Sequence, residues 1–345
     1  MGAFLGIVFH AIGGFAAGSF YIPMNRIRGW SWESGWLILG ITAWVLAPWT
    51  VAALTVPRFQ EILQQGSASV LGWTFLFGLL WGVGNLTFGL TMRYLGLSLG
   101  MALALGLTAA FGTLVPPVVA GEFTDLFTHW SGRLSLIGIL VCLLGIGVCG
   151  YAGIRKEREL PDEQARETIR EFNLRKGIGV AVVAGILSAC FAFGLQSGQP
   201  LAEAALQTGT DTLYQNNVVL IVILAGGFLT NAAWCVYLNF RNRSFDDYTR
   251  TDAPLAKNYL ATSLGGLTWY LQFFFYGMGT TRLAGSLEFA SWTLHMAFII
   301  LFSNLWGLYF QEWRGVSRTT YATVATGLAL LVLSTVVIGL GSYLA

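Results

Sequence analysis

Charged side chains are scarce in this sequence. Asp, Glu, Lys and Arg together make up 10% of the 345 residues, whereas soluble globular domains carry about 25%. A chain with so few charges lacks the solvated surface that a soluble fold needs. The net charge of +2 is also too small to indicate nucleic acid as a partner. Because 55% of the residues are hydrophobic and the mean hydropathy is +0.65, the sequence predicts a protein whose surface faces a lipid bilayer.

Residues that hold metals or carry covalent chemistry are also few, since the chain has four Cys and three His. Cys142, Cys149, Cys190 and Cys235 all fall inside apolar runs and lack the spacing of a metal site, so we expect small buried hydrophobic side chains. The sequence contains no nucleophile–base motif and no cofactor-binding loop. We therefore predict that the protein is not an enzyme, binds no metal or cofactor and needs no obligate protein partner.

Long apolar runs dominate what is present. A helix needs about 20 mainly apolar residues to cross a bilayer core, and about ten windows qualify. They cover residues 4–23, 34–56, 70–92, 97–119, 133–153, 177–197, 215–239, 259–279, 286–310 and 320–344. The first run has no charged leader, so we interpret it as a span and not as a signal peptide. The expected fold class is an all-α membrane protein with about ten transmembrane helices.

One hydrophilic segment, residues 154–176, divides these windows into two groups of five. It mixes acidic and basic residues with helix formers, and we interpret it as a charged cytoplasmic linker between a first half, residues 1–153, and a second half, residues 177–345. Aligning Trp81 with Trp269 pairs further Gly, Ser and Ala residues of the two halves. An odd number of spans per half inverts one half relative to the other. The predicted architecture is therefore two inverted five-helix repeats, a transporter design whose site lies where the repeats meet.

Lys and Arg concentrate on one side of the predicted membrane. Only Arg58, Arg133 and Arg282 of the 19 basic residues lie on the other side. Because basic loops stay in the cytoplasm, we expect a cytoplasmic linker and two periplasmic termini. The run from Gly29 to Glu33 contains two Trp residues, and we expect it to include interfacial anchors.

The ninth window contains Glu288, the acidic residue most plainly inside an apolar run. On a helix, Glu288, Ser291, Trp292 and His295 share one stripe, at spacings of three, four and seven. Ionisable groups inside a membrane are costly and often relay protons, so we interpret Glu288 as a proton carrier. The alternative is a structural pair with Arg282 near the membrane face. His295 fits a proton relay, a hydrogen-bond partner of the solute or a satisfied core histidine.

The eighth window carries a second candidate group around Trp269. Trp269, Gln272, Phe273 and Tyr276 lie along one helical face, with Tyr270 beside them. Sugars present apolar C–H faces and a rim of hydroxyls, and aromatic rings with amide and phenol groups match both features. The alternatives are an aromatic packing face, favoured for the phenylalanines, and a role for Gln272 in joining helices.

Polar residues in the first and third windows complete the set of candidates. Trp81 and Asn85 are i,i+4 neighbours that correspond to the Trp269 region in the second half, and His10 lies in the middle of the first window. We therefore add Trp81, Asn85 and His10 to the expected sugar-binding residues, together with Ser291 and Trp292. Asn231 and two Gln residues in other windows are weaker candidates, which we expect to be structural.

Several of these stretches resemble the L-rhamnose–proton symporter family of the drug/metabolite transporter superfamily. They are Trp30–Glu33, Trp81–Asn85, Gly89–Gly96, Glu171–Leu174, Trp269–Tyr276 and Ser291–Met296. The resemblance implies ten helices in two inverted repeats, an acidic residue where Glu288 stands, and proton-coupled uptake of L-rhamnose, or of L-lyxose or L-mannose, across the bacterial inner membrane. Residues 239–257 depart from the family pattern.

We expect transport by alternating access, with the proton as coupling ion and the sugar, protons and lipid as the partners. The alternative is a carrier or exporter of another small polar metabolite within the same superfamily.

Overall fold

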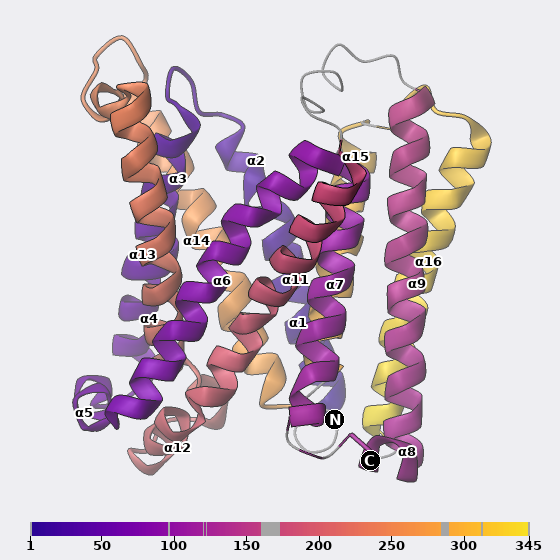
Figure 1. The fold of residues 1–345 in the computed structure, drawn as a ribbon. Helices are drawn as coiled ribbons and strands as arrows, with labels where there is room; N and C mark the ends of the chain where they lie inside the picture. The colour runs from indigo at the N-terminus through magenta and orange to yellow at the C-terminus, as the bar shows by residue number, and fades with distance from the viewer. Residues whose placement is uncertain are drawn as a thin grey trace. The chain divides into compact units, whose positions relative to one another are not determined.

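The computed structural model of the chain describes residues 2–95, 97–119, 121, 123–159, 173–283, 290–311 and 313–343. Within these ranges every regular element is a helix (Figure 1). The elements are α1 (Gly2–Ser19), α2 (Tyr21–Met24), α3 (Trp32–Gly40), the π-helix η1 (Ile41–Leu46), α4 (Ala47–Thr55), α5 (Phe59–Gln65), α6 (Ala68–Leu95), α7 (Leu97–Val119), α8 (Asp125–Thr128), α9 (Trp130–Glu159), α11 (Leu174–Ser197), α12 (Gln199–Gln207), the 3₁₀ helix η2 (Thr212–Tyr214), α13 (Asn217–Asn242), the 3₁₀ helix η3 (Phe245–Tyr248), α14 (Leu255–Thr280), α15 (Ala290–Tyr309) and α16 (Arg318–Tyr343).

Eight helical segments in the described part of the chain are long and apolar enough to cross a membrane. They are Gly2–Met24, Trp32–Thr55, Ala68–Met92, Trp130–Glu159, Arg175–Gln207, Thr212–Asn242, Ala290–Tyr309 and Arg318–Gly341. Each overlaps a window predicted from the sequence, so the prediction of an all-helical, multi-pass membrane protein is confirmed. The two remaining windows coincide with α7 and α14, helices of 23 and 26 residues.

Local sequence sets several helix ends. Val56, which precedes Pro57, is extended (φ −120°, ψ 102°), because proline disfavours helical backbone in the residue before it, and α4 therefore ends at Thr55. Ser67 accepts a hydrogen bond from the Val70 backbone N–H at 3.2 Å and caps the N-terminal end of α6. Such side-chain acceptors satisfy backbone groups that a helix end leaves unpaired.

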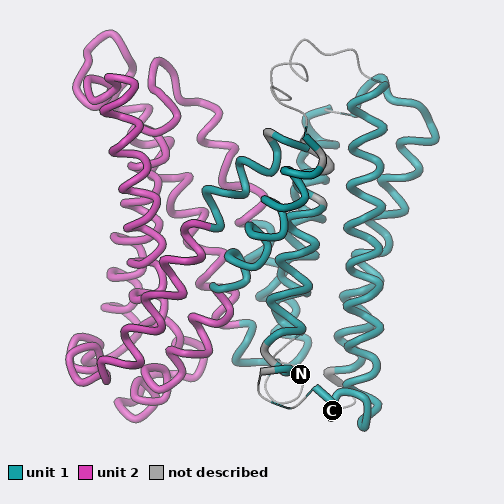
Figure 2. Tube along the Cα trace, viewed as in Figure 1, with its two compact units in different colours: residues 1–15, 84–190, 279–345 teal, residues 16–83, 191–278 magenta. Residues whose placement is uncertain are grey.

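The chain forms two compact units, each built from segments of both sequence halves (Figure 2). Unit 1 comprises residues 1–15, 84–190 and 279–345, and unit 2 comprises residues 16–83 and 191–278. The compact units therefore differ from the predicted halves 1–153 and 177–345. A repeat describes an internal relationship between sequence segments, whereas a compact unit describes packing, so the boundaries of the repeats stay a prediction.

In unit 1, α9 and α16 pack side by side (Figure 1). Glycines allow this close approach, since a Cβ added at Gly145 would lie 3.2 Å from the Gly327 carbonyl oxygen, and one added at Gly327 would lie 2.5 Å from Cys149 Sγ. Glu159, the last residue of α9, accepts a hydrogen bond at 2.6 Å from the backbone N–H of Ser317, just before α16. Its carboxylate therefore joins the two helices where α9 ends and α16 begins.

In unit 2, α6 crosses α13 with almost no space between the two backbones. A Cβ added at Gly78 would lie 2.1 Å from the carbonyl oxygen of Ile223, and one added at Gly226 would lie 2.3 Å from a carbonyl oxygen of α6. Gly82, one turn after Gly78, faces Gly227, with only 2.9 Å from its Cβ position to the Gly227 Cα atom. Small residues four apart are the usual means of close helix packing in membranes.

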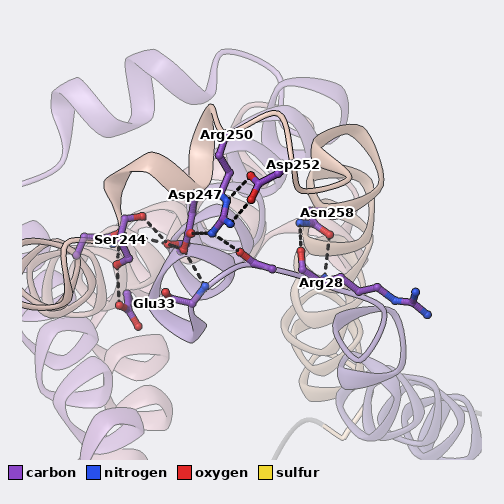
Figure 3. A network of polar contacts seen from close by, with 11 residues as sticks. Arg28, Glu33, Ser244, Asp247, Arg250, Asp252 and Asn258 are labelled. Atoms are coloured by element: carbon purple, nitrogen blue, oxygen red, sulfur yellow. Dashed lines mark hydrogen bonds and ion pairs between the residues drawn. The ribbon is translucent and has the colours of Figure 1, made fainter.

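Hydrogen bonds tie the beginning of α3 to the loop after α13 (Figure 3). Glu33 is only 4% exposed, and its Oε1 accepts hydrogen bonds from Asn242 Nδ2 at 2.9 Å and from Ser244 Oγ at 2.7 Å. Its carboxyl lies in a buried network, because partners distant in sequence supply the hydrogen bonds that a buried carboxylate needs.

Asp247 is the second buried carboxylate of this network (Figure 3). It accepts hydrogen bonds from the Ser31 backbone N–H at 2.7 Å and from Ser34 Oγ at 2.8 Å. The Arg250 guanidinium lies 3.6 Å from Asp247 Oδ1 and also pairs with Asp252. Hydrogen bonding from Arg250 holds the pKa of Asp252 below its usual value. The loop is thus fixed to α3 by charge-assisted hydrogen bonds.

Replacing Asp247 by Ala is expected to lower the free energy of unfolding by about 2–4 kcal/mol, because the Ser31 and Ser34 donors lose a charged acceptor. Thermal unfolding of the detergent-solubilised protein measures the change. Asp246→Ala is the matched control, since Asp246 is the exposed neighbour and should leave the melting temperature unchanged. Equal melting temperatures for the two variants would contradict a stabilising role for Asp247.

Candidate functional site

An aromatic cluster lies within unit 2. Its members are Trp44 in η1, Trp81 in α6, Phe191 in α11, and Trp269 and Phe273 in α14. The ring centroids of Trp44 and Trp81 lie 5.9 Å apart, and those of Trp44 and Trp269 lie 6.5 Å apart. Phe273 lies 5.3 Å from Trp81 and 4.8 Å from Phe191. Most of these pairs meet edge to face, a favourable geometry for aromatic rings, so the cluster combines broad apolar faces with indole N–H groups.

Glycines place two of these indoles. A Cβ added at Gly227 in α13 would lie 2.4 Å from the Trp81 ring, so a side chain there would displace the indole. In α14, a Cβ added at Gly266 would lie 2.6 Å from the Leu39 carbonyl oxygen. The backbone of α14 therefore reaches the end of α3 and brings Trp269, one turn after Gly266, into the cluster.

Asn231 in α13 supports the edge of the aromatic cluster. Its Oδ1 accepts a hydrogen bond from Trp36 Nε1 at 3.1 Å, and its Nδ2 donates to the Gly82 carbonyl oxygen at 3.3 Å. The Trp36 ring lies 6.2 Å from that of Trp44. The amide thus joins α3, α6 and α13, which is the structural role expected for Asn231.

The other predicted residues of α14, Tyr270, Gln272 and Tyr276, are all buried. The Tyr276 ring lies 6.1 Å from that of Phe191 and so adjoins the aromatic cluster. Tyr270 is fully buried and stacks on Phe274 at 6.3 Å. Among the described residues, no group bonds to the Tyr270 hydroxyl.

Unit 1 contains a buried group of two histidines and a serine. His10 Nε2 in α1 lies 3.0 Å from Ser291 Oγ in α15, and the His10 and His295 rings lie 5.8 Å apart at 61°. All three side chains are buried. A Cβ added at Gly279 would lie 2.7 Å from His10 Nε2, so glycine leaves room for the imidazole. Imidazoles both donate and accept hydrogen bonds and can pass protons.

The neighbouring residues of α15 bind α7. Trp292 Nε1 donates to the Thr108 carbonyl oxygen at 3.0 Å, and its ring covers Gly112, where an added Cβ would lie 2.4 Å away. Thr293 and Thr113 share a hydrogen bond of 2.6 Å between their hydroxyls. The indole donor of Trp292 is therefore engaged by the protein backbone, an arrangement that fixes α15 against α7.

Asn85 and Glu288 are the two remaining residues predicted from the sequence. Asn85 lies in the unit 1 part of α6, and within the described residues its buried Nδ2 has no acceptor. Glu288 lies outside the described residues, together with the rest of 284–289. Its role as a proton carrier therefore stays a prediction from the sequence. The predicted residues fall into two sets, since Trp81, Trp269 and Tyr276 meet in unit 2, whereas His10, Ser291 and His295 meet in unit 1.

Comparison with known proteins shows a family match over nearly the whole chain. The family model of the L-rhamnose-proton symport protein (RhaT) matches residues 2–343. The chain belongs to this family. The L-rhamnose-proton symporters of Citrobacter koseri, Salmonella paratyphi A and Salmonella typhimurium are each 39% identical to it over 340 residues, which cover 98% of this chain and 97% of each relative. The resemblance seen in the sequence is thereby confirmed.

For this member of the L-rhamnose-proton symport protein family, sequence reasoning missed part of the aromatic cluster. Trp44 and Phe191 were not among the predicted residues, because each lies in a run of mainly apolar residues. The four cysteines are buried, as predicted, and none of them forms a disulfide. Across the described ranges, no three His, Cys, Asp or Glu side chains gather in a way that could hold a metal ion.

Proposed function

We propose that this protein takes up L-rhamnose together with protons across the bacterial inner membrane by alternating access. The observation that carries the proposal is the match to L-rhamnose-proton symporters along nearly the full length of both chains. The helical, multi-pass architecture supports it. The proton is the coupling ion, and neither a cofactor nor an enzymatic reaction is required.

The full architecture that we propose has ten transmembrane helices in two inverted repeats, with a cytoplasmic linker and periplasmic termini. The lengths of α7 and α14, added to the eight apolar spans, support the count. In each half, the first long helix passes from unit 1 into unit 2 and the third returns: α1 after residue 15 and α6 after 83, then α11 after 190 and α14 after 278. This shared order of segments supports a repeat.

We assign different parts of the chemistry to the two groups of residues. The aromatic cluster of unit 2 offers apolar faces for the C–H groups of a sugar and N–H groups for its hydroxyls. The buried histidine group of unit 1 offers sites that exchange protons, next in sequence to Glu288. Coupled transport requires both groups to take part in one cycle, so that the sugar moves only with a proton.

Purified protein in proteoliposomes tests the proposed function. Adding L-rhamnose should cause proton influx, and a pH gradient of one unit, acid outside, should drive up to about tenfold accumulation at a stoichiometry of one proton per sugar, since a tenfold ratio corresponds to about 1.4 kcal/mol. A protonophore should abolish accumulation but leave sugar exchange intact.

L-lyxose, L-mannose and unrelated polar metabolites are measured in the same assay. Proton movement with another metabolite but not with L-rhamnose would favour the alternative carrier. Export driven by the gradient would overturn the direction of transport.

A further inference from the structure

The span Trp32–Thr55 contains a π-helical turn, η1, between α3 and α4. The backbone N–H of Ala47 bonds to the carbonyl oxygen of Thr42, five residues earlier. Pro48 follows immediately, and in a regular α-helix its ring would clash with the carbonyl of Trp44, four residues before it. The wider turn relieves this clash. Single π-helical turns inside α-helices are rare and occur frequently at functional sites.

The π-helical turn presents Trp44, one of the largest fully buried side chains of the protein. A Cβ added at Gly40 would lie 2.9 Å from two carbons of the Trp44 ring, so glycine four residues earlier makes room for the indole. Trp81 and Trp269 flank the same ring edge to face, at interplanar angles of 83° and 81°. The position of the indole is therefore fixed from several sides.

The indole N–H of Trp44 is buried, and none of the described residues accepts a hydrogen bond from it. The same holds for the N–H of Trp269 in the same cluster. A buried donor without an acceptor is unfavourable, because the hydrogen bond it makes to water in the unfolded chain is lost. By contrast, the neighbouring Trp36 donates to Asn231 Oδ1. Two fixed donors in one aromatic cluster thus lack the acceptor that folding normally supplies.

We propose that Trp44 is a sugar-binding residue, whose indole N–H, held by the π-helical turn, donates a hydrogen bond to a hydroxyl of the transported sugar. The inference rests on the proposed function, since it takes the sugar as the ligand. A hydroxyl oxygen is the acceptor that this N–H lacks, and the surrounding aromatic faces suit the C–H groups beside that hydroxyl. Trp44 then contributes to affinity and to the choice among sugars.

Uptake kinetics in proteoliposomes test this assignment. Trp44→Phe keeps an aromatic ring but removes the N–H, and should raise the KM for L-rhamnose about 3- to 10-fold, the value of one neutral hydrogen bond. Replacing Trp44 by benzothienylalanine, an isostere with sulfur in place of N–H, should raise the KM similarly and keep the melting temperature, so that a folding defect of the Phe variant does not decide the result. An unchanged KM for the isostere would overturn the assignment.

Analogues of L-rhamnose that each lack one hydroxyl identify the acceptor. One analogue should bind the wild-type protein more weakly than L-rhamnose does. The variant with the isostere at position 44 should bind that analogue and L-rhamnose equally well, because the two changes remove the same hydrogen bond. Additive losses for every analogue would overturn the assignment. Trp73→Phe is the matched control, since it makes the same change at an exposed position of α6 outside the aromatic cluster and should leave the KM for L-rhamnose unchanged. Wild-type protein that fails to transport L-rhamnose would instead overturn the proposed function itself.

Discussion

Glu288→Gln is expected to abolish the uphill accumulation of L-rhamnose while leaving sugar counterflow intact. Glutamine resembles the protonated carboxyl in shape and hydrogen bonding but cannot release a proton, so the variant can exchange sugar without coupling it to the gradient. In a pH gradient of one unit, the accumulation ratio should fall from up to about ten to one. Radiolabelled uptake into proteoliposomes, with and without the gradient, measures both activities.

Two variants serve as controls for the carboxyl at position 288. Glu288→Asp should retain coupling, because it keeps an ionisable group within the same stripe of the sequence. Glu203→Gln makes the same chemical change at an exposed position in α12 and should leave accumulation unaffected. Normal uphill uptake by Glu288→Gln would show that Glu288 is not the proton carrier. His10 and His295 would then be the next candidates for that role.

The transmembrane helices could be predicted from the sequence because apolar length is a local property. The window 34–56 corresponds to the span Trp32–Thr55, and the window 133–153 to Trp130–Glu159. The predicted stripe of Ser291, Trp292 and His295 is buried, since the spacing of a helix fixes which side chains share a face. Composition and spacing were therefore sufficient for these features.

The partners of individual side chains could not be predicted, because they come from distant parts of the chain. Glu33 stands 209 residues before its partner Asn242, and nothing near Glu33 distinguishes a buried carboxylate from an interfacial one. Trp44 lies in an apolar run, so its sequence neighbours favour simple packing. The readable signal was Pro48, whose ring is incompatible with a regular α-helix at Trp44. Likewise, the hydrogen bond from the Trp292 indole to the Thr108 carbonyl oxygen of α7 depends on tertiary packing, which the spacing of residues in the sequence does not reveal.

Gly78→Ala is expected to destabilise unit 2 by about 2 kcal/mol or more, the effect of overpacking a tight interface. The added Cβ would lie 2.1 Å from the Ile223 carbonyl oxygen and 2.9 Å from the Ile223 Cα atom. These atoms belong to helical backbone and cannot rotate away, so α6 and α13 must separate. The melting temperature in detergent and the amount of folded protein in membranes should both fall.

A graded series of Gly→Ala variants separates this contact from the general effect of alanine on a helix. Gly72 lies six residues before Gly78 on α6, where an added Cβ meets nothing within 4 Å, so Gly72→Ala should leave the melting temperature unchanged or raise it slightly.

The melting temperature of Gly227→Ala should fall between those of Gly78→Ala and Gly72→Ala, because its Cβ would meet the Trp81 ring, 2.4 Å away, and a ring can shift where backbone cannot. That shift displaces a member of the aromatic cluster. Gly227→Ala should therefore raise the KM for L-rhamnose even for protein that is fully folded. Equal melting temperatures of Gly78→Ala and Gly72→Ala would show that α6 and α13 can move apart without loss of stability. An unchanged KM for Gly227→Ala would contradict a role for Trp81 in sugar binding.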